Sequence, residues 1–372
     1  MKHTLRKKIL FSIFILLVGG VFLELAGQIL IYAKSFLVEP GRHAAVIEEK
    51  GYVRMKPGFE YKDETSGHTF SINSLGFRGR KISKRKPDQY LRIVTLGGST
   101  TFGIGSSENK YTYPSLLENK LNGNHEIPNI IFEVINAGVP GSRSINIFKL
   151  FSEQILKMDA DIVLIYSGWN DWNEFFNRGP SFFEYDSIFY RLNLNLSEIS
   201  VLYSKLKNVF FSYQSRIKIV DYEERALKVL NQNYFLKPYQ KNIVNLFKLC
   251  QENGIRPLLL LQPPSLTNFT VLDEMKFLLK DPYFLEEVKI LPIVRNKLME
   301  TQKNISQENN FPIIDINYMF DAFKNGDLLY FDTIHFNDKG NQIIAEGIAN
   351  WILSDKNIPV IKNLNNRSLK LS

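Results

Sequence analysis

The sequence predicts an α/β protein: a three-layer α/β/α sandwich around a central parallel sheet of about five strands, preceded by one N-terminal transmembrane helix. Five short apolar runs that each end in turn residues predict the strands of the sheet. Amphipathic patterns between them predict helices, and an alternation of strands and helices is typical of a parallel sheet. A long uncharged run near the N-terminus predicts the membrane helix. With 44% apolar and 23% charged residues among 372, the composition excludes disorder over most of the chain, as well as collagen-like and heptad-dominated fibres.

The transmembrane helix is predicted at residues 9–33. Fifteen consecutive residues from Ile9 to Leu23 carry no charge, and only Glu24 interrupts an apolar stretch of 25 residues that ends at Ala33. A membrane-spanning helix needs about 20 such residues. Residues 1–8 form a basic tail, so the positive-inside rule predicts that this tail is cytoplasmic and that the chain after the helix lies outside the cytoplasm.

The alternative for this segment is a cleaved signal peptide, which would leave a secreted or periplasmic protein. The basic start and the apolar run fit both. No small-x-small triplet follows the run, since Glu24-Leu25-Ala26 fails at its first position. The sequence therefore favours an uncleaved, single-pass anchor.

Residues 34–88 are predicted to form a stem, because glycine and proline interrupt them often. Within the stem, Ile72–Arg80 alternates apolar and turn residues, which predicts a short strand and a tight turn docked on the next domain. Six basic residues lie between Arg78 and Lys86; with the four of the N-terminal tail they sum to +10, against a net charge of +8. Such a run most often forms a solvated surface loop, and it would also suit an anionic glycan or lipid headgroup.

The main domain is predicted at residues 89–356. Its apolar runs are five or six residues long, as expected for strands buried on both faces of a sheet. A helix is predicted at Tyr239–Asn253, with the single cysteine, Cys250, as a core residue on its apolar face. An aromatic-rich interval at about 172–237 is predicted to be a cap over the upper edge of the sheet, and residues 357–372 a tail. The five predicted strands are Leu91–Leu96, Ile131–Asn136, Asp161–Tyr166, Pro257–Leu261 and Pro312–Ile316.

Candidate catalytic residues follow the strand ends, where ligands bind in open parallel sheets. Ser99 comes after the first strand and two glycines, which leave its hydroxyl little covered. Gly138 follows the second strand and lets a backbone N–H approach a ligand closely. Asn170 follows the third, and its side-chain amide can donate to an oxyanion. Each of these is also an ordinary turn residue when taken alone.

Asp332 and His335 complete this set near the C-terminus. His335 is the only histidine in the last two hundred residues. An aspartate three residues earlier, on a turn, can accept the Nδ1 hydrogen of the imidazole, which leaves Nε2 as a base for a serine. A metal site is disfavoured, because no other histidine or cysteine lies close to His335 in the sequence. Together the residues supply a nucleophile, oxyanion donors, a base and an acid that orients it, all at the same predicted edge of one sheet.

The order of these motifs resembles that of the SGNH (GDSL-like) hydrolase superfamily, of the membrane-anchored bacterial type. The resemblance covers roughly residues 89–356, and the sequence departs from it at Gly98, where the superfamily commonly has aspartate. The upstream motif Asn73–Gly79 also resembles a segment of membrane-anchored members, to which we attach no role. The matching blocks are Gly97-Gly98-Ser99, Gly138, Gly168-Trp169-Asn170-Asp171 and Asp332-Thr333-Ile334-His335.

The resemblance implies a flavodoxin-like SGNH hydrolase fold and a serine esterase that needs neither cofactor nor metal. Ser99 would attack an ester carbonyl, His335 would take the serine proton and Asp332 would orient His335. The N–H groups of Ser99 and Gly138, with the Asn170 side chain, would bind the oxyanion. The substrate would be an acyl ester on a glycan or a lipid, with a short, acetyl-like acyl group by analogy.

Other functions stay open from the sequence. An O-acyltransferase would use the same acyl-serine intermediate and pass the acyl group to an envelope glycan. A membrane-anchored, non-catalytic glycan-binding scaffold is disfavoured, because it would tolerate the loss of Ser99, Asn170, Asp332 or His335. Nucleic-acid binding ranks lowest, since the basic run lacks interleaved aromatic residues and is predicted to lie outside the cytoplasm. The sequence makes no prediction of the oligomeric state.

Overall fold

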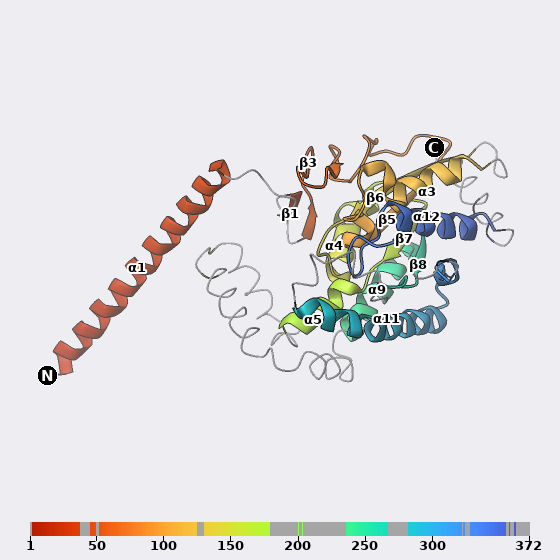
Figure 1. The fold of residues 1–372 in the computed structure, drawn as a ribbon. Helices are drawn as coiled ribbons and strands as arrows, with labels where there is room; N and C mark the ends of the chain where they lie inside the picture. Colours follow the sequence, from red (N-terminus) through yellow and green to blue (C-terminus); the bar gives the residue numbers. More distant parts are fainter. Residues whose placement is uncertain are drawn as a thin grey trace. The chain divides into compact units, whose positions relative to one another are not determined.

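The computed structural model describes residues 2–37, 45–49, 52–124, 130–178, 200, 203, 236–266, 282–321, 323, 328–354, 357 and 361 (Figure 1). The chain divides into two compact units, one formed by Met1–Gly41 and Asn177–Asp221, the other by Arg42–Phe176 and Tyr222–Ser372. Most of the predicted cap at about 172–237 and of the predicted tail at 357–372 lies outside the described residues.

Helix α1 (Lys2–Leu37) belongs to the first unit and contains the predicted apolar segment. Its stretch Phe11–Ile29 is 19 residues long and, within the described parts of the chain, is the one segment long and apolar enough to cross a membrane. Length and composition fit a signal anchor and a signal peptide equally.

The second unit is built on one five-stranded sheet, which confirms the predicted parallel sheet. The strand order is β6-β5-β7-β8-β9, and every pair is parallel. The chain therefore crosses outward from β5 to β6 and then returns past β5 to β7, which opens a crevice at the carboxyl ends of these strands. β9 is two residues long, shorter than the predicted Pro312–Ile316. The strands are β5 (Tyr90–Gly97), β6 (Ile131–Gly138), β7 (Ile162–Tyr166), β8 (Arg256–Leu260) and β9 (Ile313–Ile314).

Helices cover both faces of the sheet, so the unit has the three predicted layers (Figure 1). Successive side chains of a strand point to opposite faces. Val94 and Leu96 of β5 accordingly lie in one core with α4 and α9, while Leu91 and Ile93 lie in another with α3 and α12. The helices of this unit are α2 (Ser99–Phe102), α3 (Tyr113–Asn122), α4 (Ser144–Glu153), α5 (Trp169–Arg178, which ends in the first unit), α9 (Leu236–Glu252), α11 (Pro282–Asn309) and α12 (Asp338–Ile352).

Helix α9 confirms the helix predicted at Tyr239–Asn253, with its start three residues earlier. Its apolar stripe packs in the core of the α4 face, and Cys250 on that stripe is fully buried. Burial raises the pKa of the Cys250 thiol. The cysteine is therefore the core residue that the sequence predicted, not a nucleophile.

Residues of the predicted stem from Arg42 onward lie in the same compact unit as the sheet. They form two antiparallel pairs, β1 (Val46–Glu49) with β2 (Tyr52–Met55) and β3 (Glu60–Lys62) with β4 (Thr69–Ser71). Their apolar side chains share the core of the α4 face. This segment is thus packed as part of the domain's interior. Its buried apolar residues in this core are Ala45, Tyr52, Met55, Phe59, Ile72 and Phe77.

The predicted strand and tight turn are present at Ile72–Arg80. Ile72 and Arg78 form an antiparallel bridge, and the Asn73 side chain accepts hydrogen bonds from the N–H groups of Leu75 and Phe77. Gly76 has φ +84°, and a Cβ there would lie 2.8 Å from the Met55 carbonyl oxygen. Glycine is required at this position both by the backbone conformation and by the close approach.

The turn continues onto β6, which is the outer strand of the sheet. Arg78 N–H donates to the Asn136 carbonyl oxygen at 3.2 Å. Further along the same strand, Val134 N–H donates to Glu118 at 2.7 Å, and the Asn122 side-chain amide pairs with both the N–H and the carbonyl of Phe132 at 2.8 Å. These hydrogen bonds thus satisfy backbone N–H and carbonyl groups that an outer strand would otherwise leave without partners.

The interpretation of the basic run as a solvated loop is wrong for two of its residues. Arg78 is buried, with 5% of its surface exposed. The Lys86 ammonium contacts Asp161 at 2.6 Å, and its side chain is 10% exposed. Arg80 is half-exposed and pairs with Glu118. The basic run alone could not predict these contacts, because the partner residues lie far away in the sequence.

Candidate active site

The turn that carries Ser99 is formed by a very close approach of backbone segments. A Cβ at Gly97 would lie 2.3 Å from the Tyr166 carbonyl oxygen, and one at Gly98 would lie 2.5 Å from the Asn170 Nδ2. Only glycine fits at both positions without a shift of the neighbouring atoms. β5 therefore ends directly in the short helix α2, whose first residue is Ser99, with 9% of its surface exposed.

Ser99, His335 and Asp332 form one connected chain of side chains. Ser99 Oγ lies 2.7 Å from His335 Nε2, and His335 Nδ1 lies 2.6 Å from Asp332 Oδ2. The other carboxylate oxygen of Asp332 accepts the N–H groups of Ile334 and His335 at 3.0 and 2.9 Å, which fixes the loop. The structure thus brings together three predicted residues that are 236 positions apart at the extremes.

Asp332 is held in its ionised form. Burial raises the pKa of its carboxyl, but the neighbouring His335 and the hydrogen bonds from His335 and Ile334 outweigh burial and lower the pKa below its usual value of 3.8. An ionised carboxylate at Nδ1 holds the imidazole as the tautomer with Nε2 free toward Ser99.

Gly138 does not take the predicted role of oxyanion donor. Its N–H donates to the side chain of Asn136 at 3.1 Å. A Cβ at this glycine would lie 2.2 Å from the Phe102 backbone nitrogen, so the residue packs against α2 rather than facing a ligand. Gly138 serves the close contact between β6 and α2.

Gly141 takes the place beside Ser99 that the sequence analysis gave to Gly138. Both Gly141 and Ser99 line the same pocket. Gly141 has φ +78°, a Cβ there would meet nothing within 4 Å, and its N–H has no acceptor among the described residues. The Pro140-Gly141 pair after the strand was the available signal, since such a pair marks a turn that can expose a backbone N–H.

Asn170 lies at the site as predicted, at the start of α5. Its Nδ2 donates to the Ser142 carbonyl oxygen at 3.0 Å. The same nitrogen lies so close to Gly98 that a Cβ added there would be 2.5 Å away. A primary amide has two N–H groups, so one remains for a ligand. Asn170 thereby connects the turn after β6 with the turn that bears Ser99.

The sequence analysis missed Asp171, which orders the neighbouring loop. The buried carboxylate accepts the Ser144 hydroxyl at 2.6 Å and the Ser144 N–H at 2.9 Å, at the first residue of α4. Burial raises the pKa of Asp171 to about 6, although both hydrogen bonds from Ser144 act in the opposite direction. This contact fixes the loop 139–143 against α5.

The sequence analysis also missed Arg78, which holds the end of α2. Its Nη1 donates to the carbonyl oxygens of Phe102 and Gly103 at 3.1 and 2.7 Å, and its Nε donates to the Asn109 side chain at 2.9 Å. The guanidinium also lies 4.8 Å from the centre of the Phe102 ring. Burial lowers the pKa of Arg78 to about 9, with Asp338 acting to raise it. Arg78 is a positioning residue for the turn that carries Ser99.

Among the described residues, no group of three histidine, cysteine, aspartate or glutamate side chains is arranged to hold a metal ion. The arrangement as a whole can generate a serine nucleophile, transfer its proton to an imidazole and donate N–H groups to an oxyanion.

Comparison with known proteins places this site in a family context. The model of the GDSL-like Lipase/Acylhydrolase family matches residues 95–343. Similar solved structures include the acetyl xylan esterase AlAXEase, at 15% identity and a TM-score of 0.44 over 71% of this chain and all of that one. The lipase/acylhydrolase from Enterococcus faecalis is 15% identical, with a TM-score of 0.42 over 70% of this chain and 95% of that one. No curated protein matches the sequence.

Proposed function

Because the chain belongs to the GDSL-like lipase/acylhydrolase family, whose members hydrolyse esters, we propose that it is a serine esterase that uses Ser99, His335 and Asp332 on acyl esters outside the cytoplasm. The observation that carries this proposal is the continuous contact from Ser99 Oγ through His335 to Asp332. A chain of this kind makes a serine hydroxyl a nucleophile near neutral pH.

In the proposed reaction, Ser99 Oγ forms a bond to the acyl carbon while its proton passes to His335 Nε2. The bond to the leaving alcohol then breaks, and His335 returns the proton to the alcohol oxygen. Water repeats the two steps on the acyl-serine, which releases the acid and restores the hydroxyl. The ionised Asp332 stabilises the imidazolium in both halves of the reaction, and its lowered pKa supports that role.

The developing oxyanion would be bound by the N–H groups of Ser99 and Gly141 and by the Asn170 side chain. What supports Gly141 in this set is its unpaired N–H beside Ser99 in the described part of the chain, whereas the Gly138 N–H already donates to Asn136. Loss of one such donor typically costs about 100- to 1,000-fold in kcat.

The proposed location rests on α1. Its apolar stretch Phe11–Ile29 and the basic residues before it favour a membrane anchor with the N-terminus in the cytoplasm and the second unit outside. The proposed substrates are therefore acyl esters of envelope glycans or lipids.

The test is hydrolysis of 4-nitrophenyl esters by the full chain in lipid nanodiscs. Ser99→Ala is expected to lower kcat/KM by at least about 1,000-fold. Ser152→Ala is the matched control, because this serine lies on α4 and donates only to the Lys149 carbonyl oxygen. Intact mass after incubation with a fluorophosphonate should show one adduct, absent in Ser99→Ala. Equal turnover by the wild type and Ser99→Ala would refute the proposal.

A further inference from the structure

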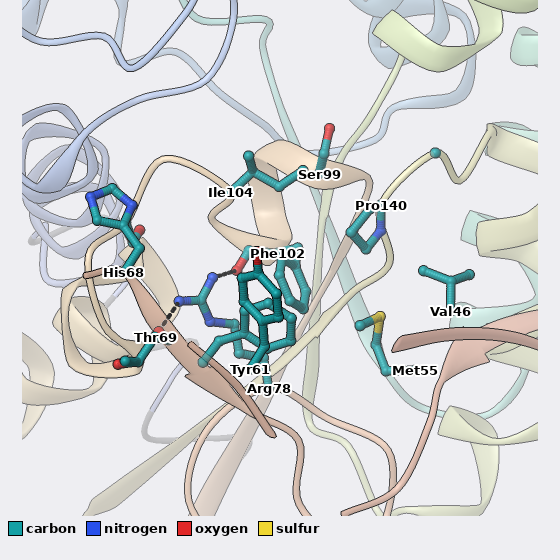
Figure 2. Close-up of a pocket in the computed structure, with 13 residues that line it drawn as sticks. Val46, Met55, Tyr61, His68, Thr69, Arg78, Ser99, Phe102, Ile104 and Pro140 are labelled. Atoms are coloured by element: carbon teal, nitrogen blue, oxygen red, sulfur yellow. Dashed lines mark hydrogen bonds between the residues drawn. The ribbon is translucent and has the colours of Figure 1, made fainter. Parts of the chain in front are cut away.

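A pocket of about 420 Å³ opens beside Ser99 (Figure 2). Ser99 stands at its upper rim in this view, Tyr61, Phe102 and Arg78 lie below, and Val46 lies to one side. Pockets that bind small ligands measure about 300–1,000 Å³. The volume is therefore enough for a ligand group, and an acetyl group would leave most of it empty.

The lining of the pocket is mainly apolar. Its walls include Val46, Met55, Phe70, Phe102 and Ile104, and none of the described residues that line it is acidic. Tyr61, His68, Thr69 and Ser106 also line the pocket, but the Tyr61 hydroxyl donates to Asp63 and the Ser106 hydroxyl donates to the Tyr111 carbonyl oxygen. A sugar ring would therefore leave several of its hydroxyl groups without partners, which is costly. An aliphatic chain needs no partners and gains free energy from the transfer out of water.

Among the described residues of the lining, Arg78 is the one lysine or arginine, and it already makes several hydrogen bonds. Its Nη1 and Nε donate to the carbonyl oxygens of Phe102 and Gly103 and to the Asn109 side chain. Its Nη2 makes one long contact, at 3.5 Å, with the Thr69 carbonyl oxygen. Most of the guanidinium N–H groups are thus occupied, and the apolar walls contribute most to the selection of the occupant.

The position of the pocket relates it to the acyl side of the ester. Gly141, a proposed oxyanion donor, lines it together with Ser99 and Pro140. Figure 2 shows Ser99 at the rim with its hydroxyl pointing away from Phe102 and Arg78, so an acyl chain bonded to Ser99 Oγ would have to bend back past this rim. The rest of the acyl chain can then enter the pocket.

Most of the wall comes from outside the part of the chain that the family model matches. That match begins at residue 95, whereas seven of the thirteen lining residues lie between Val46 and Arg78. The segment 46–78 comprises the two strand pairs β1–β2 and β3–β4 and the turn that ends at Arg78. This segment thus lies outside the matched family core.

We propose that this pocket receives the acyl chain of the substrate, and that the segment 46–78 sets the acyl length at several carbons rather than at acetyl. The inference rests on the proposed esterase function. It departs from the acetyl-like group that analogy predicted from the sequence.

The test compares two valines on the β1–β2 hairpin. Val46 lines the pocket, whereas Val53 is partly buried against the same core but does not line it. Val46→Phe and Val53→Phe therefore add the same volume to neighbouring strands. The readout is the ratio of kcat/KM for 4-nitrophenyl hexanoate to that for the acetate, measured on the full chain in nanodiscs. Because each ratio is taken within one protein, a partial loss of folded enzyme cancels.

In the wild type, each methylene that enters the pocket should raise kcat/KM by about fourfold, so hexanoate is preferred strongly over acetate. Val46→Phe should lower the hexanoate-to-acetate ratio at least tenfold, and Val53→Phe should leave it within twofold. Equal ratios in the two variants, or a wild-type preference for acetate, would overturn the inference while Ser99-dependent turnover kept the esterase function intact.

A second series fixes which side of the ester enters the pocket. The ratio of hexyl acetate to ethyl acetate hydrolysis varies only the alcohol, so Val46→Phe should not change it. A change in this ratio in place of the acyl ratio would make the pocket a leaving-group site and overturn the acyl assignment.

A binding measurement keeps the inference testable without turnover. Hexan-2-one is a neutral ester analogue that cannot be hydrolysed, and saturation-transfer NMR can detect its binding to Ser99→Ala in nanodiscs. The signal should disappear when Val46→Phe is added and persist when Val53→Phe is added, with empty nanodiscs as the blank. Binding that ignores Val46→Phe overturns the pocket assignment, whatever the activity assays show.

Discussion

The contact between Gly98 and Asn170 links the turn that carries Ser99 to a proposed oxyanion donor. A Cβ at Gly98 would lie 2.5 Å from the Asn170 Nδ2, which is the tip of a side chain that can rotate. A Cβ at Gly97 would instead lie 2.3 Å from the backbone oxygen of Tyr166, which cannot move alone. The two adjacent glycines therefore differ in what a methyl group would disturb.

We expect Gly98→Ala to displace the Asn170 amide and to lower kcat by about 100-fold with little change in Tm, as for the loss of one oxyanion donor. Gly97→Ala should instead lower Tm, because the strand end itself must shift. The measurement is kcat and Tm for both variants and for Asn170→Ala. If the losses in Gly98→Ala and Asn170→Ala simply multiplied in the double variant, the two residues would act independently and this account would be wrong.

Asp171 makes stability depend on pH. Its pKa is about 6 in the folded protein and near 3.8 when unfolded. Between these values the folded state binds more protons, so this carboxyl's contribution to stability is complete below about pH 4 and is lost as the pH rises through about 6. The shift corresponds to a loss of about 2–3 kcal/mol.

Asp171→Asn should remove that loss. The free energy of unfolding of the variant, relative to wild type, should therefore rise by about 2 kcal/mol between pH 4 and pH 7. Denaturant unfolding at a series of pH values measures this difference, and taking the difference removes the contributions of other titrating groups. A difference that stays constant with pH would show that Asp171 does not titrate in this range.

At the residue scale, the sequence predicted those site residues that come directly after a strand or lie in the last loop. Ser99, Asn170, Asp332 and His335 converge as expected, because the carboxyl ends of parallel strands meet at one edge. Gly138 was the wrong glycine, because the Asn136 side chain takes its N–H, and a contact of this kind depends on the folded geometry. Arg78 was hidden in a basic run for the same reason.

At the scale of elements, the pairing of β5 with β6 places Arg92 opposite Glu133. The two side chains are 0% and 3% exposed, and their charged groups lie 2.6 Å apart. Arg92 also donates to the carbonyl oxygens of Ser83 and Lys84, which holds the end of the stem against the sheet. A buried pair of this kind is costly to break from one side.

Glu133→Ala should lower the free energy of unfolding by about 3–5 kcal/mol, because it leaves the buried Arg92 charge without its partner. The double variant Arg92→Met with Glu133→Leu should recover much of this loss. Chemical denaturation of wild type, Arg92→Met, Glu133→Leu and the double variant gives the coupling. A double variant as unstable as the sum of the single variants would mean that the pair is not coupled.

The elements themselves were largely predictable. Continuous apolar runs closed by turn residues identify strands buried on both faces, and all five observed strands lie within two residues of the predicted ends. β9 is shorter than predicted. The apolar run 312–316 indicates which residues are buried, but only Ile313 and Ile314 form backbone pairs with β8. Docking was predicted only for Ile72–Arg80. The packing of the rest of the stem into the core was not predictable, since frequent glycine and proline there predicted little regular structure.

At the scale of the whole molecule, the single cysteine provides a test of topology. Cys250 is fully buried and therefore should not react with a maleimide in the folded protein. Glu64 is exposed in the turn between β3 and β4. In Glu64→Cys, the introduced thiol is thus the one accessible site on the described second unit.

We expect a membrane-impermeant maleimide to label Glu64→Cys on intact bacterial cells with a permeable outer envelope, and to leave wild type unlabelled. The labelled protein should sediment with membranes, and its mass should include residues 1–41 if α1 is an uncleaved anchor. Labelling only after lysis would place the second unit in the cytoplasm and contradict the proposed location. A soluble product that lacks α1 would favour the cleaved signal peptide.

The bonded rim of β6 has a consequence for how this protein behaves at high concentration. An outer strand with open N–H and carbonyl groups is a template on which another chain can add a strand, and this is a common start of aggregation. Here Asn122, Glu118 and the backbone of Arg78 already occupy groups along that rim. These bonded groups of β6 are thereby closed to pairing with a strand of a neighbouring molecule.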